Sequence, residues 1–568
     1  MCKHSHTLTH FRTTRLRFVL VLLRAGIASC GIGTTNTTIN IGKLMPDQTT
    51  QNEPSAKTDS RSLSKYIPLL AMFAVATLLF FVVNAQFSAS GRPTMDMLIG
   101  LALLNLGVYV WIRVKSGFAQ RLQIKLIALL VASQALLFAT VQMEGIYGNG
   151  RPVFSWRWKS LPADTFAKQN DSLDSVGTSI ELPSVAHWSQ FRGPQRDGVS
   201  PTQLADWNDR PPKELWRQPI GAGWSSFVVA GEFCFTMEQR SDTECTTCYE
   251  TATGKQIWIH RDAERFSEIT GGEGPRSTPT FAAGFLYTLG ATGILNCLDA
   301  TNGDVLWSND ILKEHDALNC YYGMCTSPLV VDDLVIVNPG GKSASLVAYN
   351  RLNGDLVWRD GNSEASYASP HLMTICGVQQ VLNFNADGMT SHDLKTGRVL
   401  WDIPWISNPS ERNNVCQPIQ LSPNQVFLSS GYGRGSALFE FSISDNGFQR
   451  TTVWQTKKLR SKFASAVFDG RHIFGLDEGI LVCLDAASGD RVWKQGRYNH
   501  GQILLAGDHI IVQSEDGYVA QVAANATQFR ELARVQALNQ RTWTHPVVID
   551  DLLLTRNDRE VVCYRLFK

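Results

Sequence analysis

The spacing of apolar residues along the chain changes near residue 144. Before that point, three long apolar stretches follow one another, at residues 67–87, 98–112 and 124–143. The first and third are about 20 residues long, which is enough for a helix to cross a hydrocarbon core of about 30 Å. A helix packed on a soluble domain would interrupt such stretches with polar residues every three or four positions. The pattern therefore predicts an α-helical anchor of three transmembrane helices within residues 66–143.

The charges around these stretches predict their orientation. Lysine and arginine gather at residues 57–65 and 113–125, whereas the loop after the first stretch holds Arg92 as its one cation. The positive-inside rule then predicts a multi-pass protein of the inner (cytoplasmic) membrane. Residues after 143 are expected in the periplasm, or otherwise outside the cytoplasm.

The segments beside the spans have a polar composition. Residues 1–65 predict a disordered cytoplasmic segment, and residues 144–187 predict a linker. Residues 18–23 followed by Cys30 imitate a lipoprotein signal, but Arg24 interrupts the short apolar region. An acylated Cys30 is therefore one alternative. A start at Met45, which would mean that residues 1–44 are not native, is another.

After residue 187 the chain changes to short β-rich segments that repeat. Glycine recurs every 42 to 51 residues and is followed four positions later by tryptophan, at Gly254/Trp258, Gly303/Trp307, Gly354/Trp358, Gly397/Trp401 and Gly489/Trp493. A looser copy stands at Gly447/Trp454. Each period holds four such segments separated by turn residues, which is the pattern of a propeller blade. The glycine serves a turn that needs a positive φ angle.

The repeat predicts an all-β propeller of eight blades over residues 188–568. Seven units lie near residues 221–260, 276–310, 325–361, 367–405, 415–459, 462–496 and 500–538. Residues 542–568 hold three strands, and residues 213–219 hold a strand with Trp216 but no blade of their own. We expect residues 213–219 to supply the missing outer strand and close the ring, which leaves no open sheet edge. Seven blades is the alternative, if the weak unit at 500–538 merges with a neighbour.

The turn sequence of the repeat resembles that of a known family. Residues 298–307 and 484–493 read Leu-Asp-Ala-x-x-Gly with tryptophan four positions on. This resembles the tryptophan-docking motif of the PQQ-like repeat (quinoprotein alcohol dehydrogenase-like) propellers, and residues 188–198 look like the opening of their membrane-linked members. The resemblance covers residues 188–568. It implies a blade-docking role for Trp216, Trp258, Trp307, Trp358, Trp401, Trp454 and Trp493. The motif is specific for fold and not for function, since these tryptophans hold blades together with or without a cofactor.

A ligand on the propeller axis would contact residues just before the innermost strands, where the blades converge. The candidates for cofactor binding at this channel mouth are Trp224, Arg276, Tyr322, His371, His500, Trp543 and His545. Arginine, histidine and aromatic side chains can grip an anionic planar compound by charge-assisted hydrogen bonds and stacking. A water-filled channel lined by hydrogen-bonded polar residues is the alternative.

Composition and motifs add no catalytic residues and no metal site. The net charge is +1 without a basic stripe, so we expect no nucleic-acid partner. One repeat position holds a small residue in six units, namely Cys248, Cys297, Cys483, Cys563, Ala348 and Ser391. This indicates a buried slot in a strand and not a redox or zinc site. Cys320 and Cys325 are close enough for a disulfide in an oxidising compartment, which stays open.

Two functions from different classes follow. The resemblance to envelope protein-assembly propellers implies a membrane-anchored, non-catalytic scaffold or binding protein without a cofactor. Its partners would be the membrane and other envelope proteins. The alternative is a membrane-bound, PQQ-dependent quinoprotein dehydrogenase that oxidises an alcohol or sugar with PQQ and calcium. Against it, the chain has no adjacent cysteine pair to stack on a quinone, and no Glu, Asn and Asp set matches a calcium–quinone site.

Overall fold

The computed structural model describes residues 100, 105–110, 112–113, 119–158, 179–408 and 412–567. The chain divides into two units, Met1–Tyr66 and Ile67–Lys568, and every described residue belongs to the second. Two expectations therefore fall outside the described residues. They are the disordered segment with Cys30 and the apolar stretch at 67–87.

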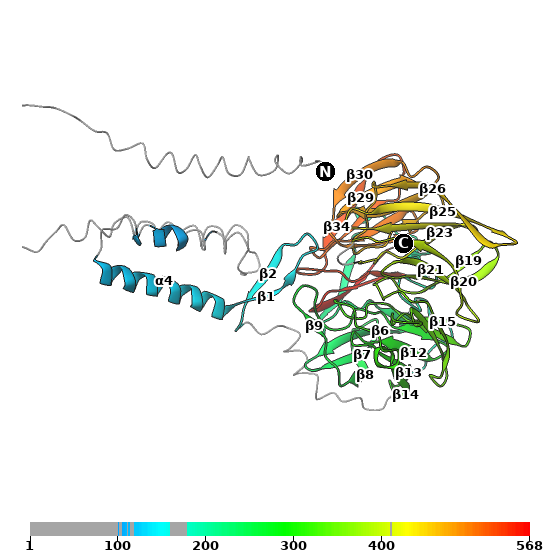
Figure 1. Ribbon diagram of the computed structural model, residues 1–568, viewed down its shortest axis with the longest axis horizontal. Helices are drawn as coiled ribbons and strands as arrows, with labels where there is room; N and C mark the ends of the chain where they lie inside the picture. Colours follow the sequence, from blue (N-terminus) through cyan, green and yellow to red (C-terminus); the bar gives the residue numbers. More distant parts are fainter. Residues whose placement is uncertain are drawn as a thin grey trace, which may run out of the picture. The chain divides into compact units, whose positions relative to one another are not determined.

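Eight sheets, each a blade of four antiparallel strands, follow one another along the chain (Figure 1). The first four blades, from inner to outer strand, are β5 (Val228–Ala230), β6 (Phe233–Arg240), β7 (Thr243–Glu250) and β8 (Gln256–Asp262); β11 (Thr280–Ala282), β12 (Phe285–Leu289), β13 (Ile294–Asp299) and β14 (Val305–Asp310); β15 (Leu329–Val331), β16 (Leu334–Val337), β17 (Leu346–Asn350) and β18 (Leu356–Asp360); and β19 (His371–Ile375), β20 (Val378–Phe384), β21 (Gly388–Asp393) and β22 (Val399–Pro404).

The other four blades have the same order. They are β23 (Ile419–Ser422), β24 (Gln425–Ser430), β25 (Gly435–Ser444) and β26 (Gly447–Thr456); β27 (Val467–Phe468), β28 (His472–Asp477), β29 (Ile480–Asp485) and β30 (Arg491–Arg497); β31 (Gln502–Ala506), β32 (His509–Gln513), β33 (Tyr518–Ala523) and β34 (Glu531–Gln536); and β35 (Val547–Ile549), β36 (Leu552–Arg556), β37 (Glu560–Arg565) and β4 (Lys213–Pro219). A short strand, β3 (Val199–Ser200), adds in parallel to β31. Between blades lie the pair β9 (Ser267–Glu268) and β10 (Gly272–Glu273) and a short helix, α6 (Ile311–Glu314).

The ring closes with strands from both parts of the chain, as predicted. In the eighth blade, β4 pairs antiparallel with β37, with Trp216 opposite Cys563. The prediction of eight blades is also confirmed, because residues 500–538 form a complete blade. Its strands β31 and β32 are buried at every residue. Such burial on both faces explains why this unit lacks the usual alternation of apolar and polar residues.

Six of the seven repeat tryptophans reach into the next blade. Each donates its indole N–H to a main-chain carbonyl there at 2.8–3.2 Å, in the pairs Trp216–Thr251, Trp258–Ala300, Trp307–Arg351, Trp358–Leu394, Trp454–Ala486 and Trp493–Asn525. In five of these turns the glycine three residues later lies under the indole with a φ angle between +70° and +81°. A Cβ atom there would lie 2.4–2.9 Å from the ring. The glycine is thus required by the indole as well as by the turn.

Trp401 is the exception. Its indole N–H donates to Gln380 Oε1 of its own blade at 2.7 Å, and its ring lies 4.4 Å from that of Phe441 in β25. The next blade has the ten-residue strands β25 and β26 in place of the short turn. Gly447 lies at the tip of that hairpin, where a Cβ atom would meet nothing within 4 Å. Gly447 is therefore not a copy of the docking glycines.

Two carboxylates are buried in the first blade. Glu238 lies 2.7 Å from the Arg240 guanidinium, and both side chains are fully buried. Burial alone would raise the pKa of Glu238, but Arg240 and Arg556 lower it to about 2. Glu244 instead accepts hydrogen bonds from the main-chain N–H of Ala291, and burial raises its pKa to about 7.

Before the propeller, the described residues hold one helix long and apolar enough to cross a membrane, α4 (Gln120–Thr140). Residues 105–110 of the second expected span are helical, but three transmembrane helices are not shown. The third expected span ends at Thr140, and a β-hairpin of β1 (Val141–Ile146) and β2 (Pro152–Trp156) follows directly (Figure 1). Part of the expected linker is thus a folded hairpin.

Candidate functional site

The innermost strands enclose a chamber of about 660 Å³ at the centre of the propeller. Each blade contributes residues at or just before its innermost strand, because these segments converge there. Six of the seven expected channel-mouth residues line this chamber: Trp224, Arg276, Tyr322, His500, Trp543 and His545. His371 does not, since it is buried with its Nε2 atom 3.1 Å from the main-chain oxygen of Gln195.

One wall of the chamber is a cluster of aromatic rings around an arginine. The rings of Trp224 and Trp543 lie 5.0 Å apart, and Phe463 lies 5.3 Å from Trp543. The guanidinium carbon of Arg541 lies 5.0 Å from the Trp224 ring and 4.4 Å from the Trp543 ring. Such contacts stabilise a buried cation through the ring quadrupoles. Burial nevertheless lowers the pKa of Arg541.

The β1–β2 hairpin forms one boundary of the chamber, and we call it the roof hairpin. Its residues 146–150 line the chamber. Arg541 Nη1 donates to the carbonyl of Ile146 at 2.7 Å, and Lys462 Nζ donates to the carbonyl of Gly148 at 2.6 Å. The N–H of Gly148 donates to Glu515, which also accepts from the Trp543 indole at 2.8 Å. The cations of the chamber are therefore largely engaged by the protein itself.

An ion pair anchors the first strand of the roof hairpin to the eighth blade. Arg559 Nη2 lies 2.6 Å from Glu144 Oε2, and the two side chains are only 11% and 9% exposed. A nearly buried ion pair of this kind is costly to break, because each charge would lose a close opposite charge where little water can replace it. The hairpin is thus a built part of the chamber.

Residues 188–198 form the opposite boundary. Phe191 lines the chamber, and Arg192 beside it donates to the carbonyl of Ala466 at 2.8 Å. Arg192 Nη1 lies 2.7 Å from His545 Nε2. Burial and the Arg192 charge lower the pKa of His545 well below its ordinary value, so the neutral imidazole accepts this hydrogen bond. Arg196 crosses to other blades, where its guanidinium donates to the carbonyls of Ser327, Pro328 and Pro370.

Two histidines and one cysteine of the chamber have pKa values far from neutral pH. Burial lowers the pKa of His500 to about 4, so both chamber histidines are neutral at pH 7. Burial raises the pKa of Cys325 to about 12, which keeps it a thiol. A general acid or base works best with a pKa near the operating pH, and none of these three groups has one.

The chamber residues also do not fit a calcium–quinone pair. Calcium takes about six to eight oxygen ligands, carboxylates among them. Among the described residues, Glu478 is the one carboxylic residue that lines the chamber, and no group of three His, Cys, Asp or Glu could hold a metal. Cys320 and Cys325 are free thiols. That the protein works without a cofactor remains a prediction.

The repeats and the closed ring define the class of the protein, an eight-bladed propeller of PQQ-like repeats. The family model described as Outer membrane protein assembly factor BamB matches residues 241–495 and 447–565. The chain therefore belongs to this family.

Individual proteins are similar to this chain at low identity. The Outer membrane protein assembly factor BamB of Shewanella oneidensis is 23% identical over 327 residues, which cover 53% of this chain and 75% of the relative. Among solved structures, BamB from Moraxella catarrhalis has a TM-score of 0.46 at 17% identity, covering 63% of this chain and 98% of that one. Quinohemoprotein alcohol dehydrogenase from Comamonas testosteroni has a TM-score of 0.49 at 11% identity, covering 71% and 84%.

These comparisons correct the expected location. The positive-inside rule predicted a multi-pass protein of the inner membrane, whereas the matched family and the Shewanella relative are named for the outer membrane. The prediction of an inner-membrane, multi-pass protein is therefore wrong. It rested on three spans, of which the described residues contain one candidate.

Proposed function

We propose that this protein is a non-catalytic scaffold or binding protein of the cell envelope that takes part in the assembly of outer membrane proteins. The family match across the blades, residues 241–565, carries the proposal. The chamber supports it, because the protein's own roof hairpin and residues 188–198 bound the chamber and carbonyls of the hairpin engage Lys462 and Arg541. The partners would be other envelope proteins, which the loops and blade edges on the outside would recruit.

Affinity purification tests this proposal. The tagged full-length chain is isolated in detergent from native envelopes after cross-linking, and the attached proteins are identified by mass spectrometry. We expect enrichment of outer membrane β-barrel proteins or of the proteins that assemble them, relative to an unrelated tagged envelope protein. Depletion of the chain should lower the amount of β-barrel proteins in the outer membrane. No such enrichment and unchanged barrel levels would refute the scaffold function.

A PQQ-dependent dehydrogenase is the second candidate. The observation in its favour is the aromatic wall of the chamber together with Arg276 and Lys462, which suits a planar anion. The full-length protein is mixed with PQQ and calcium, and dye reduction is followed with alcohols and sugars. Saturable PQQ binding with turnover would establish the enzyme and overturn the scaffold proposal. The absence of both would remove the dehydrogenase.

A further inference from the structure

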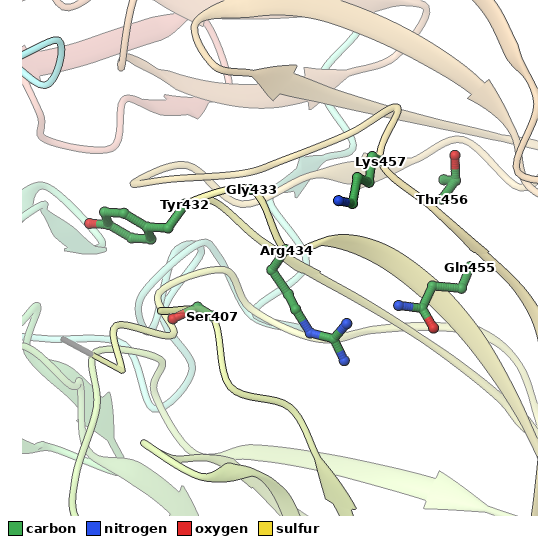
Figure 2. A pocket seen from close by; sticks show the side chains of 7 residues that line it. All are labelled: Ser407, Tyr432, Gly433, Arg434, Gln455, Thr456 and Lys457. Carbon is green, nitrogen blue, oxygen red and sulfur yellow. The ribbon is translucent and has the colours of Figure 1, made fainter. Parts of the chain in front are cut away.

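A second pocket lies on the fifth blade, outside the chamber. It has a volume of about 560 Å³ and is lined by the turn between β24 and β25, the end of β26 with the residue after it, and Ser407, which follows β22 (Figure 2). Figure 2 shows the Arg434 and Gln455 side chains extending toward each other, while Lys457 lies apart from them and extends toward the turn at Gly433. Among the residues that the structure describes, no aspartate or glutamate lines the pocket.

Arg434 is held on a rigid platform. Its guanidinium carbon lies 3.8 Å from the centre of the Trp405 ring, and Trp405 is 1% exposed. The Trp405 indole donates to Ser430 Oγ at 3.0 Å, and that hydroxyl donates to Asn414 Oδ1 at 2.7 Å. An arginine stacked on an aromatic face keeps the edge of its guanidinium available for a planar anion.

That edge is unpaired within the protein. Over the described ranges of the chain, the Arg434 guanidinium makes no hydrogen bond and no ion pair. Burial without a nearby anion lowers the pKa of Arg434. Neighbouring cations differ, since Arg412 pairs with Asp387 at 2.6 Å and Lys458 pairs with Asp490 at 2.6 Å. Arg434 is thus a fixed, partly buried cation that has no carboxylate.

Lys457 and Gln455 add to this arrangement. Lys457 is exposed and, in the part of the chain that the structure describes, has no ion-pair partner. Gln455 supplies an amide donor and an amide acceptor on the same side as Arg434. The site therefore combines a stacked guanidinium, an exposed ammonium group and an amide, which matches a carboxylate carried on a peptide.

We propose that this pocket binds an acidic side chain of a partner protein, with the carboxylate on Arg434 and Lys457. The inference rests on the scaffold function proposed above and names the chemistry of the partner. A peptide suits the place because the pocket opens beside β26, the outer strand of its blade, whose ten residues are mostly exposed. Exposed strand edges offer main-chain hydrogen bonds to an extended segment.

Peptide binding tests the pocket. A short fluorescein-labelled peptide of alternating glutamate and serine is titrated with the full-length protein in detergent, and fluorescence anisotropy is measured. We expect saturable binding that weakens with salt. The same peptide with glutamine in place of glutamate should bind more weakly, by roughly tenfold or more, since its hydrogen bonds to the cations lose their charge assistance. Equal binding of the two peptides would overturn the proposal.

Variants locate the site. Arg434→Gln should weaken binding by roughly tenfold or more, and Arg434→Lys should fall in between, because lysine keeps the charge but not the planar fork. Lys395→Gln, in an exposed turn of the fourth blade, is the matched control and should change nothing. Lys457→Gln gives a second variant on an exposed position that the fold does not need. Unchanged peptide binding in both Arg434→Gln and Lys457→Gln refutes the site. Inorganic phosphate that displaces the labelled peptide as well as unlabelled peptide does also refutes it.

The two proposals fail in different ways. If the wild-type chain enriches outer membrane assembly partners and Arg434→Gln enriches them equally, the pocket is wrong and the scaffold function stands. If the wild-type chain enriches none, the scaffold function is wrong. The peptide titration still decides the chemistry of the pocket in that case.

Discussion

Replacing one docking glycine by alanine gives a quantitative test of how indoles join the blades. Gly303 has a φ angle of +81°, and a Cβ atom there would lie 2.6 Å from the Trp258 ring. Gly447 has a φ angle of +92°, and a Cβ atom there would meet nothing within 4 Å. Both alanine variants carry the same backbone strain, and only Gly303→Ala also collides with an indole.

The expected losses of stability separate backbone strain from the collision with the indole. A non-glycine residue in the left-handed region costs about 1–2 kcal/mol, which both variants should show. Overpacking should add about 1–3 kcal/mol in Gly303→Ala alone. The Trp258 ring cannot withdraw freely, because it is 1% exposed and its N–H donates to the carbonyl of Ala300 at 3.2 Å. The expected difference between the variants is therefore about 1–3 kcal/mol.

Urea unfolding followed by tryptophan fluorescence measures this difference on the full-length protein in detergent. The dependence on urea should keep the same slope in both variants, so that a shifted midpoint reports stability. A double-mutant cycle with Trp258→Leu is the control. In that background Gly303→Ala should cost no more than Gly447→Ala, because the colliding ring is gone. Equal destabilisation by the two glycine variants in the wild-type background would refute docking by the indole.

Three further predictions concern buried charges and the roof hairpin. Because the folded pKa of Glu244 is raised to about 7, the free energy of unfolding of the wild-type protein should fall by up to about 3 kcal/mol as pH rises from about 4.5 to 7. Glu244→Gln should flatten this pH dependence, measured by urea unfolding at several pH values. An unchanged pH dependence would contradict the raised pKa of Glu244. Because the pKa of Glu238 is lowered to about 2, its stabilisation is present at neutral pH and is lost as pH falls from about 4.5 toward 2. Glu238→Gln should cost about 3–5 kcal/mol at pH 7, since it removes the buried negative charge that Arg240 and Arg556 face. A loss below about 1 kcal/mol would count against this prediction. Gly148→Ala should loosen the roof hairpin, because a Cβ atom would lie 2.4 Å from the His500 ring. Gly150→Ala meets no atom within 4 Å but has a φ angle of +83°, so it carries backbone strain alone. Hydrogen exchange of residues 145–151 should therefore quicken more in Gly148→Ala, and a larger effect of Gly150→Ala would show that the loop does not pack on His500.

The blade count and the closure could be predicted because their signals are local in sequence. The glycine–tryptophan spacing marks five of the blades, and residues 213–219 read as a strand without partners of their own. The same signal misled at Gly447, where the spacing fits but the strands are long and no indole lies above the glycine. Spacing shows where a turn lies, whereas packing decides what covers it.

The chamber walls were predictable and its two ends were not. Residues before an innermost strand point to the centre by topology alone, and six of the seven candidates line the chamber; that they bind a cofactor stays a prediction. His371 does not line the chamber, because its imidazole contacts the main-chain oxygen of Gln195 instead. The roof hairpin depends on contacts such as Glu144–Arg559 and Ile146–Arg541, whose members lie 415 and 395 residues apart. The sequence around each of these residues does not indicate which distant residue it contacts. Residues 188–198 hold two arginines and Asp197, and nothing in that spacing marks the arginines as buried.

The pairing of β4 with β37 also constrains how the protein is made. Glu214 and Tyr564 contact each other across 350 residues, so β4 leaves the ribosome long before the strand that covers its edge exists. During that interval the edge of β4 is open to mispairing with other chains. Contacts of such long range also slow folding. A chain cut short before β37 would keep this strand permanently uncovered, so truncated products should aggregate, and quality control by chaperones should matter most at the last step of synthesis.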